Sequence, residues 1–132
     1  PIILKGKLDR IDEVDGKLRI IDYKTGNVTS SQVEIVDWSE ITSEYDYIKA
    51  FQLLFYALMY NSKEPISSFE AGIFSFKNLN SGLLRFATKD KKGSRKKDTT
   101  ITAETLTSFT SELKKMILEI CNPQIPFQEK EL

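Results

Sequence analysis

Two aspartates and a lysine near the start of the chain have the side-chain types and spacing of a metal-assisted hydrolytic site. Asp22 and Lys24 are two residues apart, so they project from the same face of a β-strand. The pair Asp15-Gly16 favours a two-residue type I′ hairpin turn, and pairing across that turn places Asp9 opposite Asp22. Two facing carboxylates repel each other. The arrangement is physically reasonable if a divalent cation lies between them, with Lys24 acting on the attacking water or on the charge of the transition state.

The same residues also have a plainer interpretation, as exposed charges on a hairpin with Lys24 compensating nearby acids. Asp12, which faces Arg19 across the same turn, is an example of an ordinary cross-strand ion pair. The register itself depends on the length of the turn, because a bulge or a longer loop would shift the pairing by one residue. On the residues alone, both interpretations stay open.

A second pair of polar residues, Gln52 and Tyr56, is four residues apart and therefore shares one face of a helix. Apolar residues surround the pair on nearly all sides of that helix, which predicts that it is buried. Polar side chains on a buried helix need partners. The two residues either bond to neighbouring backbone or contact the substrate, the attacking water or the lysine of the hairpin.

Three ordered segments together resemble the core of RecB-type nucleases in the PD-(D/E)xK superfamily. They are Gly6-Lys7-Leu8-Asp9-Arg10-Ile11-Asp12, Ile20-Ile21-Asp22-Tyr23-Lys24-Thr25-Gly26 and Gln52-Leu53-Leu54-Phe55-Tyr56. Three motifs in order are far more specific than any one of them. The resemblance implies an α/β fold with a restriction-endonuclease-like core, in which a mixed sheet with an antiparallel hairpin is flanked by helices.

The resemblance also implies roles for these residues in the hydrolysis of DNA. Asp9, Asp22 and the backbone carbonyl of Tyr23 would bind Mg²⁺ or Mn²⁺, and Lys24 would act on the water or the transition state. The Gln and Tyr of the third segment would support the substrate or the water. The implied setting is cytoplasmic, in bacterial recombination and repair, with a helicase domain or subunit as partner; a CRISPR-associated nuclease is a less favoured parent. The rival hypothesis is a catalytically inactive module that binds DNA or acts as a scaffold.

Departures from the family pattern predict that residues 1–132 are one partial domain, the C-terminal portion of a RecB-like nuclease domain. Relatives usually carry a histidine or another metal ligand on a helix upstream of the hairpin, and this chain contains no histidine. Some relatives hold an iron–sulfur cluster through several cysteines, which is possible here only in a longer parent chain. Cys121 is the single cysteine, and we expect it to be buried at a helix end. The fragment alone is expected to bind metal weakly, and it need not cleave DNA by itself.

The most basic segment of the chain, residues 89–97, has two interpretations. It is either a solvated hairpin tip or a clamp for DNA phosphates, whose affinity would fall steeply with salt. The candidate backbone contacts are Lys91, Lys92, Arg95, Lys96 and Lys97. Three aromatic residues, Trp38, Tyr45 and Tyr47, are candidates for stacking on an unpaired base, although packing over the helix is the favoured role for them.

The elements that must position these residues follow the order β-β-α-β-β-α. Strands are predicted at residues 2–14 and 17–24, and a long polar connection over 26–44 contains one short strand at 33–36. Asp46 is expected to cap a helix over 47–60. Two further strands are predicted at 69–76 and 83–88, with a turn at 78–82. An amphipathic helix over 102–120, capped by Thr102, follows.

Composition is ordinary for a globular protein, with 40% hydrophobic and 29% charged residues. The 19 basic and 19 acidic residues cancel, so DNA binding must depend on where charges are placed. The absence of histidine excludes the usual serine triad and histidine-based zinc sites. A single cysteine excludes an internal disulfide and suits a reducing cytosol. No apolar run is long enough for a membrane span. The sequence also lacks the phosphate-binding loop of an ATPase.

Overall fold

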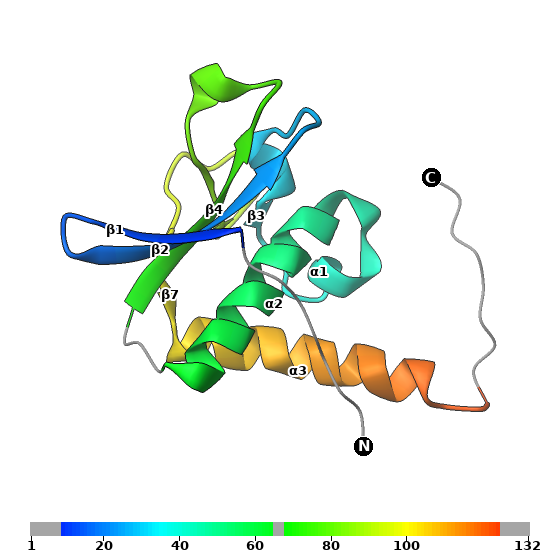
Figure 1. Ribbon diagram of the computed structural model, residues 1–132. Coiled ribbons are helices and arrows are strands. Elements are labelled where there is room, and N and C mark those ends of the chain that lie inside the picture. The colour runs from blue at the N-terminus through cyan, green and yellow to red at the C-terminus, as the bar shows by residue number, and fades with distance from the viewer. Residues whose placement is uncertain (1–8, 65–67, 125–132) are drawn as a thin grey trace.

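A mixed β-sheet with helices on one side forms the framework of the protein (Figure 1). The computed structural model describes residues 9–64 and 68–124. The main sheet has the strand order β1-β2-β4-β5, and β7 pairs with the beginning of β4. Its strands are β1 (Arg10–Val14), β2 (Lys17–Lys24), β4 (Ser68–Ser75), β5 (Leu84–Arg85) and β7 (Ile101–Thr102). Because β1 and β2 are antiparallel while β2 and β4 are parallel, the predicted α/β class with a mixed sheet and a hairpin is confirmed.

The hairpin of β1 and β2 has the predicted turn and the predicted register. Asp15 and Gly16 have φ angles of 53° and 77°, the left-handed conformation that a type I′ turn requires at both positions. Val14 faces Lys17, and the pairing continues without a bulge to Arg10 opposite Ile21. The predicted part of the first strand before residue 9 lies outside the described residues.

Helix α2 (Ile48–Lys63) connects β2 to the parallel strand β4 and covers one face of both strands. On that face Ile20 of β2 and Ile73 of β4 are fully buried, as are Leu53 and Leu54 of α2. Burial of side chains of this size stabilises the fold by about 1.5–3 kcal/mol each. The helix that was predicted over residues 47–60 is therefore present and continues to Lys63.

The C-terminal helix α3 (Ala103–Ile120) packs beside α2 through its first turns. Thr102 caps it as predicted, since its hydroxyl accepts a hydrogen bond of 3.4 Å from the N–H of Thr105. Phe109 is buried and meets Phe51 of α2 edge to face at 5.3 Å. The far end of α3 leaves this core, and Ile120 is 52% exposed although its spacing predicted an inward position.

Several connecting elements differ from the predictions. The strand predicted over residues 83–88 is divided at the buried Phe86: β5 pairs with β4, whereas β6 (Ala87–Thr88) pairs with β3 (Glu34–Ile35), the confirmed short strand. The polar connection also contains η1 (Ser30–Gln32) and α1 (Glu40–Ser43), and η3 (Leu79–Ser81) forms part of the later turn. The predicted Asp46 cap is wrong. Residue 46 lies inside η2 (Tyr45–Tyr47), so the N-cap of α2 is Tyr47, whose side chain makes no capping bond.

None of the helices in the described ranges is long and apolar enough to cross a lipid bilayer.

Candidate active site

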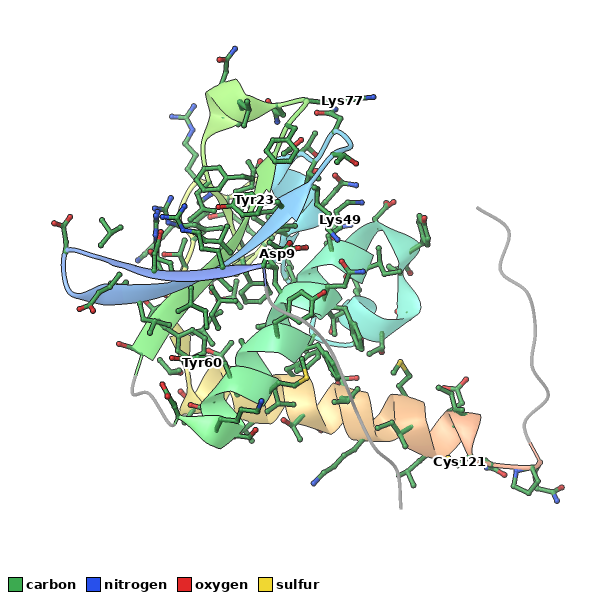
Figure 2. The ribbon with its side chains drawn as sticks, in the orientation of Figure 1. Asp9, Tyr23, Lys49, Tyr60, Lys77 and Cys121 are labelled. Carbon is green, nitrogen blue, oxygen red and sulfur yellow. The ribbon has the colours of Figure 1, made fainter. Side chains whose placement is uncertain are left out.

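The two aspartates of the hairpin lie beside each other next to α2. Asp22 is on the face of β2 that α2 covers and is 5% exposed. Asp9 directly precedes β1 at the end of the hairpin (Figure 2), and its Oδ2 accepts a hydrogen bond of 3.0 Å from the N–H of Tyr23. Burial raises the pKa of the Asp22 carboxyl, and the adjacent Asp9 carboxyl raises it further. The site thus holds a buried carboxyl group against a second one.

Lys24 connects the carboxylate of Asp22 to α2. Its Nζ lies 3.0 Å from Oδ2 of Asp22 and donates a hydrogen bond of 2.7 Å to Oε1 of Gln52. Apart from this ion pair, Oδ2 of Asp22 has no hydrogen-bond partner within the described part of the chain. The ammonium group is therefore held between a carboxylate and an amide, and its charge opposes the rise in the pKa of Asp22.

Tyr56 follows Gln52 by one helical turn and belongs to the same group of side chains. The pKa of its hydroxyl is raised first by burial and then by the negative charges of Asp22 and Asp9. The contacts of the hairpin and α2 bring together Asp9, Asp22, Lys24 and Gln52, four of the side chains proposed from the motifs. Tyr56, the fifth, is on the same helix, where the charges of the two aspartates still affect its pKa.

The backbone carbonyl of Tyr23 lies on the same side of β2 as Asp9. In a β-strand the N–H and C=O groups of one residue point toward the same neighbouring strand, and the N–H of Tyr23 reaches Asp9. The next carbonyl, that of Lys24, points the opposite way and accepts a hydrogen bond of 2.9 Å from the N–H of Phe76 on β4. Tyr23 thus offers a carbonyl oxygen beside the two carboxylates.

These oxygen atoms suit a hard divalent cation. Two carboxylates and a carbonyl are ligands that Mg²⁺ accepts, with water and substrate oxygens completing its coordination. A cation next to Asp22 would also offset the cost of burying its charge, and it would use the carboxylate oxygen that lacks a hydrogen bond. Within residues 9–64 and 68–124, no group of three or more aspartate, glutamate, cysteine or histidine side chains is placed to hold a metal ion. The two aspartates therefore suit a divalent cation that has only two carboxylate side chains as protein ligands.

A comparison with protein families identifies the superfamily of this chain. The model of the PD-(D/E)XK nuclease superfamily matches residues 2–132. The chain belongs to this superfamily. Its mixed sheet, flanked by helices, is consistent with the restriction-endonuclease-like fold expected for a member. No curated protein and no solved structure matches the chain.

One residue that supports this carboxylate site, Ser75, was missed from the sequence. It is fully buried on β4 opposite Lys24. Its hydroxyl donates a hydrogen bond of 2.6 Å to the carbonyl of Gly26 and accepts one of 3.2 Å from the N–H of Val28. Ser75 therefore holds the segment after Lys24 against the sheet. The available signal was a polar residue at the end of the apolar series Phe69, Ala71 and Ile73 on one face of the strand.

The basic segment of the nuclease domain forms a closed loop on the small sheet. Thr88 and Asp98 exchange two backbone hydrogen bonds of 2.9 Å at its base. Lys97 does not extend freely from it, since its Nζ lies 2.6 Å from Oε2 of Glu34, while Lys89 binds Oε1 at 2.8 Å. All five members of the predicted set are exposed, and Lys91, Lys92, Arg95 and Lys96 are the ones not bound to Glu34. In the described ranges, no hydrogen bond or ion pair connects them to the carboxylate site.

The exposure of the remaining aromatic candidates and of the cysteine tests the roles predicted for them. Trp38 packs against the core and its ring lies 6.1 Å from that of Phe86, so the packing role is confirmed. Tyr47 is also half-buried against the core, whereas Tyr45 is 58% exposed. The prediction that Cys121 is buried is wrong. It does cap the end of α3, but that end extends beyond the core and the thiol is exposed.

Proposed function

We propose that this member of the nuclease superfamily hydrolyses phosphodiester bonds of DNA with Mg²⁺ or Mn²⁺ as cofactor. The single observation that supports the proposal best is the convergence of Asp9, Asp22 and Lys24, from a hairpin, with Gln52 from the following helix. A decorated surface hairpin would leave these charges in solvent, but Asp22 is almost completely buried and carries a raised pKa. A titratable group whose pKa is shifted by burial and a charged neighbour is a candidate for a functional site.

In this proposal Asp9 and Asp22 hold the cation, and the carbonyl of Tyr23 joins them. When bound, the cation would supply Lewis-acid chemistry, polarising the scissile phosphate and lowering the pKa of water. The carboxylates fix its position because both are held. Asp9 is oriented by the backbone of Tyr23, and Asp22 is enclosed by the apolar face of the sheet.

Lys24 would hold the attacking water or stabilise the negative charge that develops on the phosphorus centre. An ammonium group that is already held in position is effective in this role because it needs little reorganisation during the reaction. The hydrogen bond that Lys24 donates to Gln52 keeps the ammonium group in place and leaves its other protons available. Tyr56 would donate a hydrogen bond to a phosphate oxygen or to the water. Its raised pKa keeps the phenol protonated in the physiological range.

The finer assignment rests on the motifs that resemble RecB-type nucleases. We propose a RecB-like subtype, a role in bacterial recombination and repair, a helicase domain or subunit as partner, and a cytoplasmic setting. The exposed basic side chains of residues 91–96 would supply contacts to the DNA backbone, which are independent of sequence. An iron–sulfur cluster belongs to this proposal only for a longer parent protein.

Cleavage of labelled DNA by the 132-residue chain tests the proposal. We expect cleavage with Mn²⁺ or Mg²⁺, none in EDTA, and a loss of about 100-fold or more in the variants Asp22→Asn and Lys24→Gln. Lys114→Gln, an exposed change on α3, is the matched control. Tight DNA binding by the wild type without cleavage under any metal would instead support the inactive DNA-binding module.

A further inference from the structure

Three aromatic rings form a stack on the face of the sheet opposite α2. The ring of Tyr23 lies between those of Phe74 and Phe76, with centroid distances of 6.1 and 5.9 Å and interplanar angles of 17° and 5°. The strand register produces this arrangement, because Tyr23 pairs with Phe74, and Phe76 is two residues further along on the same face. The rings are therefore nearly parallel and offset, which is a favourable geometry for π-systems.

The stack is accessible and has cations at its border. Phe76 is 53% exposed, and Tyr23 and Phe74 are half-buried. Nη1 of Arg10 lies 3.3 Å from the hydroxyl of Tyr23, yet the arginine side chain is still 57% exposed. Lys77 is exposed immediately after Phe76, and Figure 2 shows it beyond Tyr23 at the far end of the sheet from Asp9. Single exposed apolar residues are common on protein surfaces, but a parallel stack beside two exposed cations is not.

The stack is continuous with the carboxylate site. Tyr23 lies between Asp22 and Lys24 in the chain, and its own N–H binds Asp9. The N–H of Phe76 binds the carbonyl of Lys24. At the ends of β2 and β4, the carboxylate site therefore lies on one face of the sheet and the aromatic rings lie on the opposite face. Only the thickness of the backbone separates them.

We propose that Tyr23, Phe74 and Phe76 form a stacking surface for unpaired bases of the nucleic acid strand that is cut at Asp9 and Asp22. Aromatic faces beside basic side chains are the features that bind single strands without regard to sequence, since every base has a π-face and every nucleotide a phosphate. Bases inside a duplex are already stacked and paired, so the surface selects unpaired segments. This inference rests on the proposed nuclease function.

Binding without catalysis tests the surface separately from the site. The affinities of a labelled single strand and of a hairpin duplex are measured by fluorescence anisotropy in EDTA, for the 132-residue chain and three variants. Phe76→Ala should weaken single-strand binding by about 5- to 150-fold, the range for loss of one base–aromatic stack, and should change duplex binding little. Phe76→Trp should keep the affinity. Leu118→Ala, which removes a side chain that is 70% exposed on α3, should have no effect.

The possible outcomes separate the inference from the proposed function. If Phe76→Ala binds the single strand within about twofold of the wild type, below the smallest stacking contribution, the inference is overturned. Mn²⁺-dependent cleavage by the same preparation would leave the nuclease function intact. If Phe76→Ala weakens binding but the wild type never cleaves, the stacking surface stands and the catalytic proposal fails. A wild type that prefers duplex over single strands would overturn the inference and point to a protein segment as the occupant of this face.

Discussion

The ammonium group of Lys24 donates a hydrogen bond of 2.7 Å to Oε1 of Gln52, and this bond joins strand β2 to helix α2. The same ammonium lies 3.0 Å from the carboxylate of Asp22. The lysine of one motif and the glutamine of another are therefore in direct contact. The helix holds in place the ammonium group that the strand carries. This relationship explains why a polar side chain is tolerated on a helix whose neighbouring residues form the core.

Removing the amide of Gln52 should impair chemistry more than binding. In Gln52→Ala the lysine loses its fixed partner, and a displacement of about 1 Å of a catalytic group can lower the rate about 100-fold. We expect kcat to fall by about this factor while KM for DNA changes little. Lys63→Gln, an exposed change at the other end of α2, is the control. An unchanged kcat with a raised KM would show that Gln52 binds substrate instead of positioning Lys24.

The substitution Asp22→Asn should stabilise the metal-free protein. Burial, followed by the neighbouring Asp9, raises the pKa of Asp22 in the folded state above its ordinary value. The folded state then binds more protons than the unfolded state between these two pKa values, so stability falls as pH rises through that interval. At neutral pH the buried carboxylate destabilises the fold, and its neutral replacement should raise Tm in EDTA.

The substitution Asp12→Asn, on the same hairpin, should change Tm in the opposite direction from Asp22→Asn. Arg19 donates two hydrogen bonds of 2.8 Å to Asp12 and lowers its pKa, so its ionised form stabilises the fold above the ordinary pKa and this contribution is lost as pH falls. Its replacement should lower Tm at neutral pH. A decrease in Tm for both variants would contradict the conclusion that the ionised carboxylate of Asp22 destabilises the metal-free fold. Added Mn²⁺ should raise Tm of the wild type and of Asp12→Asn but not of Asp22→Asn.

Ser75→Ala should lower the free energy of unfolding by about 1–3 kcal/mol, because it leaves the buried N–H of Val28 and the carbonyl of Gly26 without their partner. Urea denaturation measures the effect. The matched control is Ser81→Ala, whose exposed hydroxyl bonds only to the side chain of Asn78. Equal stability of the two variants would show that Ser75 does not secure the segment after Lys24.

Two adjacent lysines of the basic loop should behave differently. Lys96 is exposed, so Lys96→Gln should reduce the slope of log affinity for DNA against log salt by about one while leaving Tm unchanged. Lys97 is bound to Glu34, so Lys97→Gln should lower Tm and change the slope less. Anisotropy at several salt concentrations and a thermal melt measure both quantities. A larger slope change for Lys97→Gln would reverse the assignment of the two residues.

Features set by local chemistry were predictable from the sequence. The pair Asp15-Gly16 fixes the turn type, the turn fixes the register, and the register brings Asp9 toward Asp22. The contact between Lys24 and Gln52 was predictable only as one of several alternatives, because it depends on how α2 lies across the sheet.

Features that depend on tertiary packing were not predictable. The residues from 83 to 88 read as one strand, but burial of Phe86 turns the backbone, so that the two halves pair with different sheets. The spacing of Cys121 and Ile120 indicated burial, yet no partner in the described part of the chain covers the last turn of α3. The role of Ser75 depends on a loop nearly fifty positions earlier in the chain, and periodicity carries no information about such a contact.

The most direct test of the central claim is a Mn²⁺ titration of single-turnover DNA cleavage by the wild type, Asp22→Asn and Lys24→Gln. If the hairpin holds the cation, Asp22→Asn should lose cleavage or require far more Mn²⁺. Lys24→Gln should keep the wild-type Mn²⁺ dependence but react about 100- to 1000-fold more slowly at saturation. Wild-type rates and Mn²⁺ dependence in both variants would contradict the assignment of this hairpin as the active site.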